Sequence, residues 1–175
     1  MMADGLAIRR FAASDHDAVR ELFVKVNREL APASLRHQFA DCIALALREE
    51  IDRIEDYYDL SKKSGFWVTT DSGRLVGMFG LECIDDSTVE LRRMYVDPVV
   101  RRRGIARRML DYAESAAAQA GFTKLVLSTS ELQQAAVALY RAAGYRLSHV
   151  EKAIATTNKT VGGGLTRYYF EKTLT

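Results

Sequence analysis

The chain is poor in the residues that build disulfide frameworks, rigid turns and metal sites. Its 175 residues include two cysteines, two prolines and three histidines. Cys42 and Cys83 cannot form a disulfide framework, and neither they nor the histidines have the spacing of metal ligands. We therefore expect no metal site and two packed thiols. This usage favours a reducing compartment, and we expect the protein to be cytoplasmic.

Long apolar runs and a strong excess of one charge are also missing. No stretch approaches the roughly 18 apolar residues of a membrane helix, and residues 1–5 lack the basic-then-apolar layout of a signal peptide. We expect no membrane partner. A net charge of +2 is too small to indicate nucleic acid, so nucleic acid is disfavoured as a partner. Although the net charge is small, five arginines are clustered between Arg101 and Arg108.

Hydrophobic periodicity predicts an α/β fold in one domain, residues 1–175, with one mixed sheet covered by helices. The predicted order is β-α-α-β-β-β-α-β-α-β-β. Helices are expected at residues 17–30, capped by Ser14 and Asp15, at 35–58, from 105 to about 120, and at 132–143. Strands are expected at 6–11, 66–70, 74–83, 88–96 and 124–129, with a closing hairpin of 145–154 and 165–172 across the glycines 162–164. A strand–helix–strand crossover predicts that strands 88–96 and 124–129 are parallel.

The end of the second predicted helix is rich in carboxylates. They are predicted to form a solvated helix face, although the rim of a substrate cleft is an alternative. The carboxylates are those of Glu49, Glu50, Asp52, Glu55, Asp56 and Asp59.

The stretch from Met94 to Arg108 has the pattern of an anion site. A strand ends at Pro98, and an arginine-rich loop then opens a helix at the Arg-x-x-Gly-x-Ala core. The first N–H groups of a helix lack internal partners and lie at the positive end of its dipole, so they bind phosphate well. Gly104 has no Cβ, which lets an anion approach the backbone. The pattern predicts that a phosphorylated ligand binds here.

Two further stretches give this loop a context. Leu91 to Pro98 reads as a central strand that leads into the loop. Ala136-x-x-Leu139-Tyr140-x-x-x-Gly144-Tyr145 follows the next strand. Together, these motifs resemble the GCN5-related N-acetyltransferase (GNAT) family over about residues 75–145. The resemblance implies the acyl-CoA N-acyltransferase fold, with a motif-bearing core at about 66–145, acceptor-side helices at about 15–60 and the closing hairpin at about 145–172.

The resemblance also implies acetyl-CoA as the co-substrate. The backbone of Arg102, Arg103, Gly104, Ile105 and Ala106 would hold its pyrophosphate, with added charge from Arg101, Arg103 or Arg107. The pantetheine arm would lie against Met94, Tyr95 and Val96 as a pseudo-strand, where the two parallel strands splay apart.

By the same resemblance, Glu90 is the candidate general base and Tyr140 the candidate acid that protonates the departing thiolate. Two alternatives stay open at this stage. Glu90 is also explained as a strand carboxylate paired with Arg92 or another basic group, with Glu82 as the fallback base. Tyr140 is also explained as a packed helix tyrosine.

The chain departs from the family at one position. Many relatives carry asparagine seven residues before the tyrosine, and here that residue is Gln133. Gln133 remains a candidate contact to pantetheine or bound water. The Thr-Ser-x-x-Gln variant resembles the camello-like subgroup, which favours a small amine that carries a carboxylate. Arg36, His37 or Arg92 would then anchor that carboxylate.

The primary expectation is an N-acetyltransferase that acts on the primary amine of a small molecule or amino-acid-like acceptor. A protein or peptide acetyltransferase is one alternative, and a CoA-binding regulatory module without turnover is another. A homodimer through the last strands is also left open.

Overall fold

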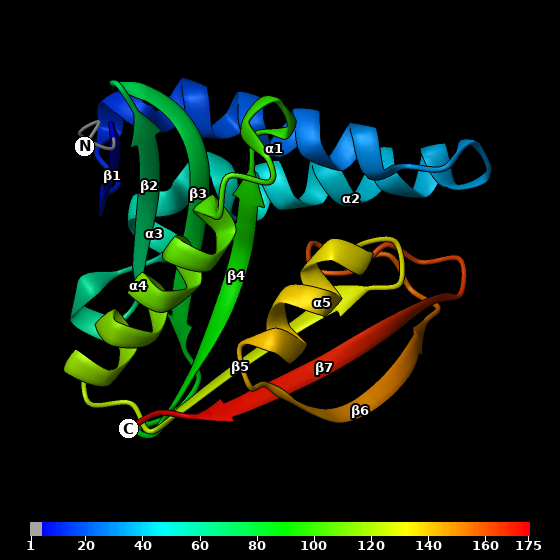
Figure 1. Ribbon diagram of the computed structural model, residues 1–175. Coiled ribbons are helices and arrows are strands. Elements are labelled where there is room, and N and C mark those ends of the chain that lie inside the picture. The colour runs from blue at the N-terminus through cyan, green and yellow to red at the C-terminus, as the bar shows by residue number, and fades with distance from the viewer. Residues whose placement is uncertain (1–4) are drawn as a thin grey trace.

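The computed structural model describes residues 5–175, which form a seven-stranded sheet in the order β1-β2-β3-β4-β5-β7-β6 (Figure 1). All neighbouring strands are antiparallel except β4 and β5, which are parallel as predicted. The sequence prediction of a mixed α/β sheet is confirmed. The strands are β1 (Leu6–Arg10), β2 (Gly65–Asp71), β3 (Arg74–Cys83), β4 (Thr88–Val96), β5 (Lys124–Ser130), β6 (Arg146–Ala153) and β7 (Leu165–Thr173).

Helices cover both faces of the sheet, and each face has its own apolar core. One core joins the sheet to α4 and α5, and the other joins it to α1, α2 and α3. Within residues 5–175, no helix has the length and apolar content needed to cross a bilayer. The helices are α1 (His16–Leu30), α2 (Arg36–Glu49), α3 (Ile54–Tyr57), α4 (Ile105–Gln119) and α5 (Gln134–Ala142).

The prediction of one continuous helix over residues 35–58 is wrong. Helix α2 ends at Glu49, and Glu50 leaves helical geometry with φ −138° and ψ −63°. A 3-10 turn at Ile51–Arg53 and the short α3 follow. The apolar side chains still recur at helical spacing because all three segments pack on the same core. Periodicity alone therefore did not reveal the break.

The prediction that Ser14 and Asp15 cap the first helix is also wrong. Asp15 precedes α1, but its carboxylate makes no cap hydrogen bond. It instead accepts hydrogen bonds from both Nη atoms of Arg9, at 2.7 and 2.8 Å, and from the Ala12 N–H at 2.9 Å. The carboxylate thus ties β1 to the entry of α1. Burial alone would oppose its ionisation, but the Arg9 hydrogen bond dominates and lowers the pKa of Asp15.

Strands β4 and β5 pair only at their beginnings, from Thr88 to Glu90 against Lys124 to Val126. Beyond Glu90 they diverge, and Figure 1 shows the V-shaped opening between them. A bulge lies in the diverging part of β4, where Arg92 faces Gly80 and Tyr95 faces Met78 across the ladder to β3. Arg93 takes the left-handed conformation there, with φ 54°. Bulges of this kind redirect side chains near functional sites.

Two glycines of β3 make room for packing on opposite sides of the sheet. A Cβ at Gly77 would lie 2.8 Å from Met109 Sδ, and one at Gly80 would lie 2.5 Å from a ring carbon of Tyr58. Glycine at these two positions therefore lets Met109 and Tyr58 approach the strand closely. Gly80 therefore helps to position Tyr58, whose hydroxyl donates a hydrogen bond to the buried carboxylate of Glu50.

Candidate functional site

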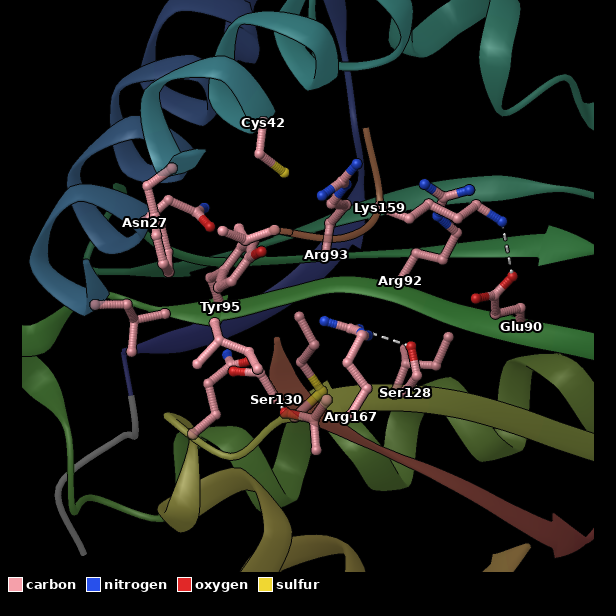
Figure 2. A pocket seen from close by; sticks show the side chains of 18 of the residues that line it. Asn27, Cys42, Glu90, Arg92, Arg93, Tyr95, Ser128, Ser130, Lys159 and Arg167 are labelled. Atoms are coloured by element: carbon pink, nitrogen blue, oxygen red, sulfur yellow. Dashed lines mark hydrogen bonds and ion pairs between the residues drawn. The ribbon is translucent and has the colours of Figure 1, made fainter. Parts of the chain in front are cut away.

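A pocket occupies the opening between β4 and β5 (Figure 2). It collects five of the predicted site residues, namely Glu90, Met94, Tyr95, Gln133 and Tyr140. The other predicted residues, Val96 and the loop 101–107, lie beyond its lining. The pocket is also lined by α1, α2 and the connection between β6 and β7, which we call the strap (residues 154–164).

The predicted anion loop leads directly into α4. Arg102 and Gly104 both have left-handed backbone conformations, with φ 64° and 74°, and Gly104 is the N-cap residue. No backbone N–H from Arg102 to Arg107 donates a hydrogen bond to any residue between 5 and 175. A Cβ at Gly104 would meet no atom within 4 Å. The loop therefore presents a row of free amides beside open space, which is the geometry that an anion needs.

The arginines of this loop are exposed and differ in their partners. Arg103 Nη1 lies 2.7 Å from Asp71, and Arg107 Nε lies 3.0 Å from Asp111. Arg101 lies 3.8 Å from Glu29. Exposed pairs of this kind contribute little to stability. These side chains are therefore free to turn toward a ligand anion at small cost.

Asp97 connects the start of this loop to α1 and β3 through hydrogen bonds. Its carboxylate accepts hydrogen bonds from the Val99 N–H, from Lys25 of α1 at 3.0 Å and from Arg74 of β3 at 2.6 Å. Burial by itself would raise the pKa of Asp97, but these three donors outweigh it and hold the pKa below its usual value. The end of β4 is thus held in one position relative to α1 and β3.

A buried ion cluster forms the wall of the pocket between β4 and α2. Glu50 is fully buried, with 0% of its side chain exposed, and its Oε2 accepts from Arg92 at 2.8 Å and from Arg93 at 2.6 Å. The Tyr58 hydroxyl donates to the other oxygen of Glu50. We call these four residues the Glu50 cluster. The bulge at Arg93 is what allows two successive arginines to reach one carboxylate.

The prediction that the carboxylates at the end of the second helix form a solvated face is therefore wrong for Glu50. It holds for Glu49, Asp52, Glu55 and Asp56, which are exposed. Glu50 lies seven residues after the buried Ile43 and four after the buried Ala46. That helical spacing on the apolar face was a signal in the sequence that pointed to its burial.

Glu90 lies at the point where the two strands part, with 19% of its side chain exposed. Arg92 is not its partner, because Arg92 binds Glu50 and Glu82. Instead, Lys159 of the strap donates to Glu90 Oε2 at 3.3 Å, and it also lies 3.9 Å from Glu82. Glu82 accepts a 2.6 Å hydrogen bond from Arg92 Nη1. Glu90 is the less constrained of the two carboxylates.

Tyr140 reaches the pocket from α5 and is 6% exposed. Its hydroxyl makes no hydrogen bond with the part of the chain that the structure describes. Burial, and then the neighbouring Tyr95, raises the pKa of Tyr140 well above its usual value. The phenol therefore keeps its proton at neutral pH and can act as a donor. Gln133, at the start of α5, accepts from the Thr129 hydroxyl at 2.9 Å, which leaves its NH₂ group for other partners.

Sequence reasoning missed two basic residues of the pocket, Lys159 and Arg167. The strap brings Lys159 over the pocket, and its Asn158 carbonyl accepts from Arg93 Nη2. Gly163 packs the strap against Leu35, immediately before α2, since a Cβ at Gly163 would lie 2.7 Å from Leu35 Cδ2. The segment with three glycines is therefore more than a hairpin tip. No local motif marked either residue.

The three carboxylate anchors that the sequence suggested are not assembled in the pocket. Arg36 and His37 are exposed at the start of α2 and do not line it. Arg92 lines it, but its guanidinium binds Glu50 and Glu82. Within residues 5–175, no group of three or more His, Cys, Asp or Glu side chains is placed to hold a metal ion.

Comparison with known proteins identifies the family. The family model described as the Acetyltransferase (GNAT) family matches residues 28–145. The chain is 37% identical to N-acetylaspartate synthetase of Danio rerio over 113 residues, which cover 62% of this chain and 38% of that protein. It is 35% identical to N-acetyltransferase family 8 member 3 of Rattus norvegicus over 108 residues, 59% of this chain and 47% of that protein. The chain thus matches less than half of the length of these relatives.

A solved structure agrees with this comparison at the level of the fold. The putative acetyltransferase yncA from Salmonella typhimurium, solved with its cofactor acetyl-CoA, superposes with a TM-score of 0.74 at 17% identity. The superposition covers 98% of this chain and 95% of that one. Since the family match spans residues 28–145 and includes the whole β4–α4–β5–α5 region, the chain belongs to the acetyltransferase (GNAT) family.

Proposed function

We propose that this protein transfers the acetyl group of acetyl-CoA to the primary amine of a small, amino-acid-like acceptor, by direct attack while both substrates are bound. The observation that carries the proposal is the placement of a free-amide loop at one end of the β4–β5 opening and of Glu90 and Tyr140 in the pocket within it. Family membership and the names of the relatives, which include N-acetylaspartate synthetase, support the same reaction.

The residues of the donor side fit acetyl-CoA. The free N–H groups from Arg102 to Arg107 would bind the two phosphates, and the open space at Gly104 leaves room for them. The unpaired edge of β4 from Met94 to Val96 offers backbone groups to the amides of the pantetheine arm. Acetyl-CoA would supply the activated acyl group, and the chain would supply its orientation.

On the acceptor side, Glu90 would take the proton of the attacking amine directly or through water. Tyr140 would give its proton to the departing thiolate. The two side chains come from different elements, β4 and α5, and both face the same pocket. A backbone N–H near Met94 would stabilise charge on the acyl oxygen.

Gly104→Ala tests the donor site. A Cβ at this position enters the space where a phosphate would approach the amides, so the dissociation constant for acetyl-CoA is expected to rise by about tenfold or more. The measurement is isothermal titration with acetyl-CoA, supported by the ligand-induced rise in melting temperature.

Gly121→Ala is the matched control for this variant. Gly121 follows the same helix, has φ 95° and also has no atom within 4 Å of its Cβ position. Both substitutions place alanine in a left-handed conformation, at a similar cost of about 1 kcal/mol. Equal affinities of the two variants for acetyl-CoA would show that the loop does not bind the donor.

Tyr140→Phe tests the proposed acid. We expect kcat to fall about tenfold near pH 7.5, less than for most general acids, because a thiol of pKa ~8.5 is already a fair leaving group. The loss is expected to shrink above that pH, and the affinity for acetyl-CoA is expected to stay unchanged. A pH profile of thiol release measures the fall in kcat and its dependence on pH, and isothermal titration measures the affinity for acetyl-CoA. An undiminished kcat at every pH would assign Tyr140 a packing role.

A further inference from the structure

We infer that the acceptor carries a carboxylate and that Arg167 of β7 binds it. This inference rests on the proposed function and names the substrate class for the same pocket. Arg167 lines the pocket together with Glu90 and Lys159. Figure 2 shows its guanidinium between β4 and β5, with the side chains of Arg92 and Arg93 on the other side of the β4 ribbon.

Arg167 has two polar neighbours in the protein, Ser128 and Tyr169, but no carboxylate partner among residues 5–175. Its Nη2 donates to Ser128 Oγ at 2.8 Å, but its Nε is buried and has no hydrogen-bond partner among the described residues. Glu151 lies opposite Arg167 in the β6–β7 ladder. The Glu151 carboxylate, however, accepts from the Tyr169 hydroxyl at 3.1 Å and lies 3.6 Å from His149. No carboxylate of residues 5–175 lies within 4 Å of the Arg167 guanidinium.

Among the cationic side chains around the pocket, Arg167 is the one that no nearby carboxylate neutralises. The other cations have partners, since Glu50 and Glu82 neutralise Arg92 and Arg93, and Glu90 lies beside Lys159. The pocket and its wall hold four cations and three carboxylates, and the surplus positive charge belongs to Arg167. The cations are Arg92, Arg93, Lys159 and Arg167, and the carboxylates are Glu50, Glu82 and Glu90.

A half-buried guanidinium that has no carboxylate partner matches a carboxylate ligand. Arginine presents parallel N–H donors that bind both oxygens of a carboxylate, and such charge-assisted bonds are stronger than neutral ones. A partly buried charge without a counter-ion costs free energy, and a bound carboxylate would supply that counter-ion. Arg167 lines the same pocket as Glu90 and Tyr140, where an acceptor amine would have to lie.

The test compares each acid with its own amide. Wild-type protein and Arg167→Gln are assayed with acetyl-CoA and either L-aspartate, S-benzyl-L-cysteine or L-phenylalanine. Each is then replaced by its amide, which is the α-carboxamide for the last two and the diamide for L-aspartate. Each kcat/KM is referred to the concentration of neutral amine, because a free α-carboxylate raises the pKa of the neighbouring amine above that of the amide. We expect the wild type to prefer at least one acid by about 10- to 100-fold in kcat/KM. In Arg167→Gln this preference is expected to fall to near one, while kcat/KM for the amide changes by less than about threefold.

The amide serves as the control for a purely structural effect, because misfolding would lower both activities together. Arg36→Gln tests the rival anchor from α2 and is expected to keep the acid preference. The inference is wrong if the wild type shows no preference for any acid, if Arg36→Gln abolishes the preference, or if Arg167→Gln instead weakens the binding of acetyl-CoA. If acetyl-CoA neither raises the melting temperature nor acetylates any amine, the proposed function itself fails, and the inference fails with it.

Discussion

Replacing Glu50 by glutamine is expected to lower the free energy of unfolding by about 3–5 kcal/mol, which is the usual loss when one partner of a buried ion pair is removed. Glu50 is completely buried, and both Arg92 and Arg93 donate to the same oxygen atom. Glutamine has a similar shape but no charge. It would leave two buried guanidinium groups with only Glu82 as a counter-ion. Urea denaturation followed by circular dichroism gives the difference.

Glu49→Gln is the control for this variant. Glu49 is the neighbouring residue, its side chain is 44% exposed, and its contact to Arg48 is 3.5 Å long. Its replacement is expected to change stability by less than about 0.5 kcal/mol. A loss below about 1 kcal/mol for Glu50→Gln would show that the cluster does not hold the fold together.

The stabilisation by Glu50 is also expected to depend on pH in one direction. Burial would raise the pKa of Glu50, but the charges of Arg93 and Arg92 and the hydrogen bonds from Arg93 and Tyr58 outweigh it, so the pKa lies below its usual value. The contribution is therefore complete above the unfolded-state pKa of ~4.3 and is lost as the pH falls through the lower folded-state pKa. Wild type is expected to lose stability more steeply than Glu50→Gln on acidification from about pH 5.

Replacing Glu90 by glutamine is expected to lower kcat/KM by about 10²- to 10⁴-fold near pH 7, the usual contribution of a general base. Glutamine keeps the size of the side chain but cannot accept a proton from the amine. The neutral fraction of the amine rises with pH, so the loss is expected to shrink at higher pH, where less deprotonation by the enzyme is needed. Steady-state kinetics from pH 6.5 to 9.5 with a fixed acceptor would reveal this trend.

Glu82→Gln is the comparison variant, because Glu82 is the other acid near Lys159. The Glu82 carboxylate accepts a hydrogen bond from Arg92, so this substitution is expected to lower stability more than it changes the pH profile of kcat/KM. An unchanged kcat/KM for Glu90→Gln would make Glu90 a strand carboxylate paired with Lys159. A pH-dependent loss in Glu82→Gln alone would move the role of base to Glu82.

Local patterns in the sequence predicted most of the fold. The bounds of β3 and β4 agree with the predicted 74–83 and 88–96. The prediction that a helix begins directly after Gly104 was also correct, since α4 begins at Ile105. Glycines, prolines and alternating apolar residues act through neighbouring backbone geometry, so their effect can be read within a few residues. The break at Glu50 was missed because apolar residues keep helical spacing across it, and the partner of the Glu50 carboxylate, Arg92, lies 42 residues away.

The sequence by itself determined the order of the strands and of the longer helices, the parallel pairing of β4 and β5 and the loop of free amides at the start of α4. These features follow from periodicity, turn residues and helix ends, which are local. Only the tertiary structure decided which charged side chains meet in the pocket. The bulge in β4 turned Arg93 to Glu50, and the strap and β7 brought Lys159 and Arg167 beside strands about 40 to 70 residues earlier in the chain. Such contacts depend on strand order and register, and no short motif carries that information.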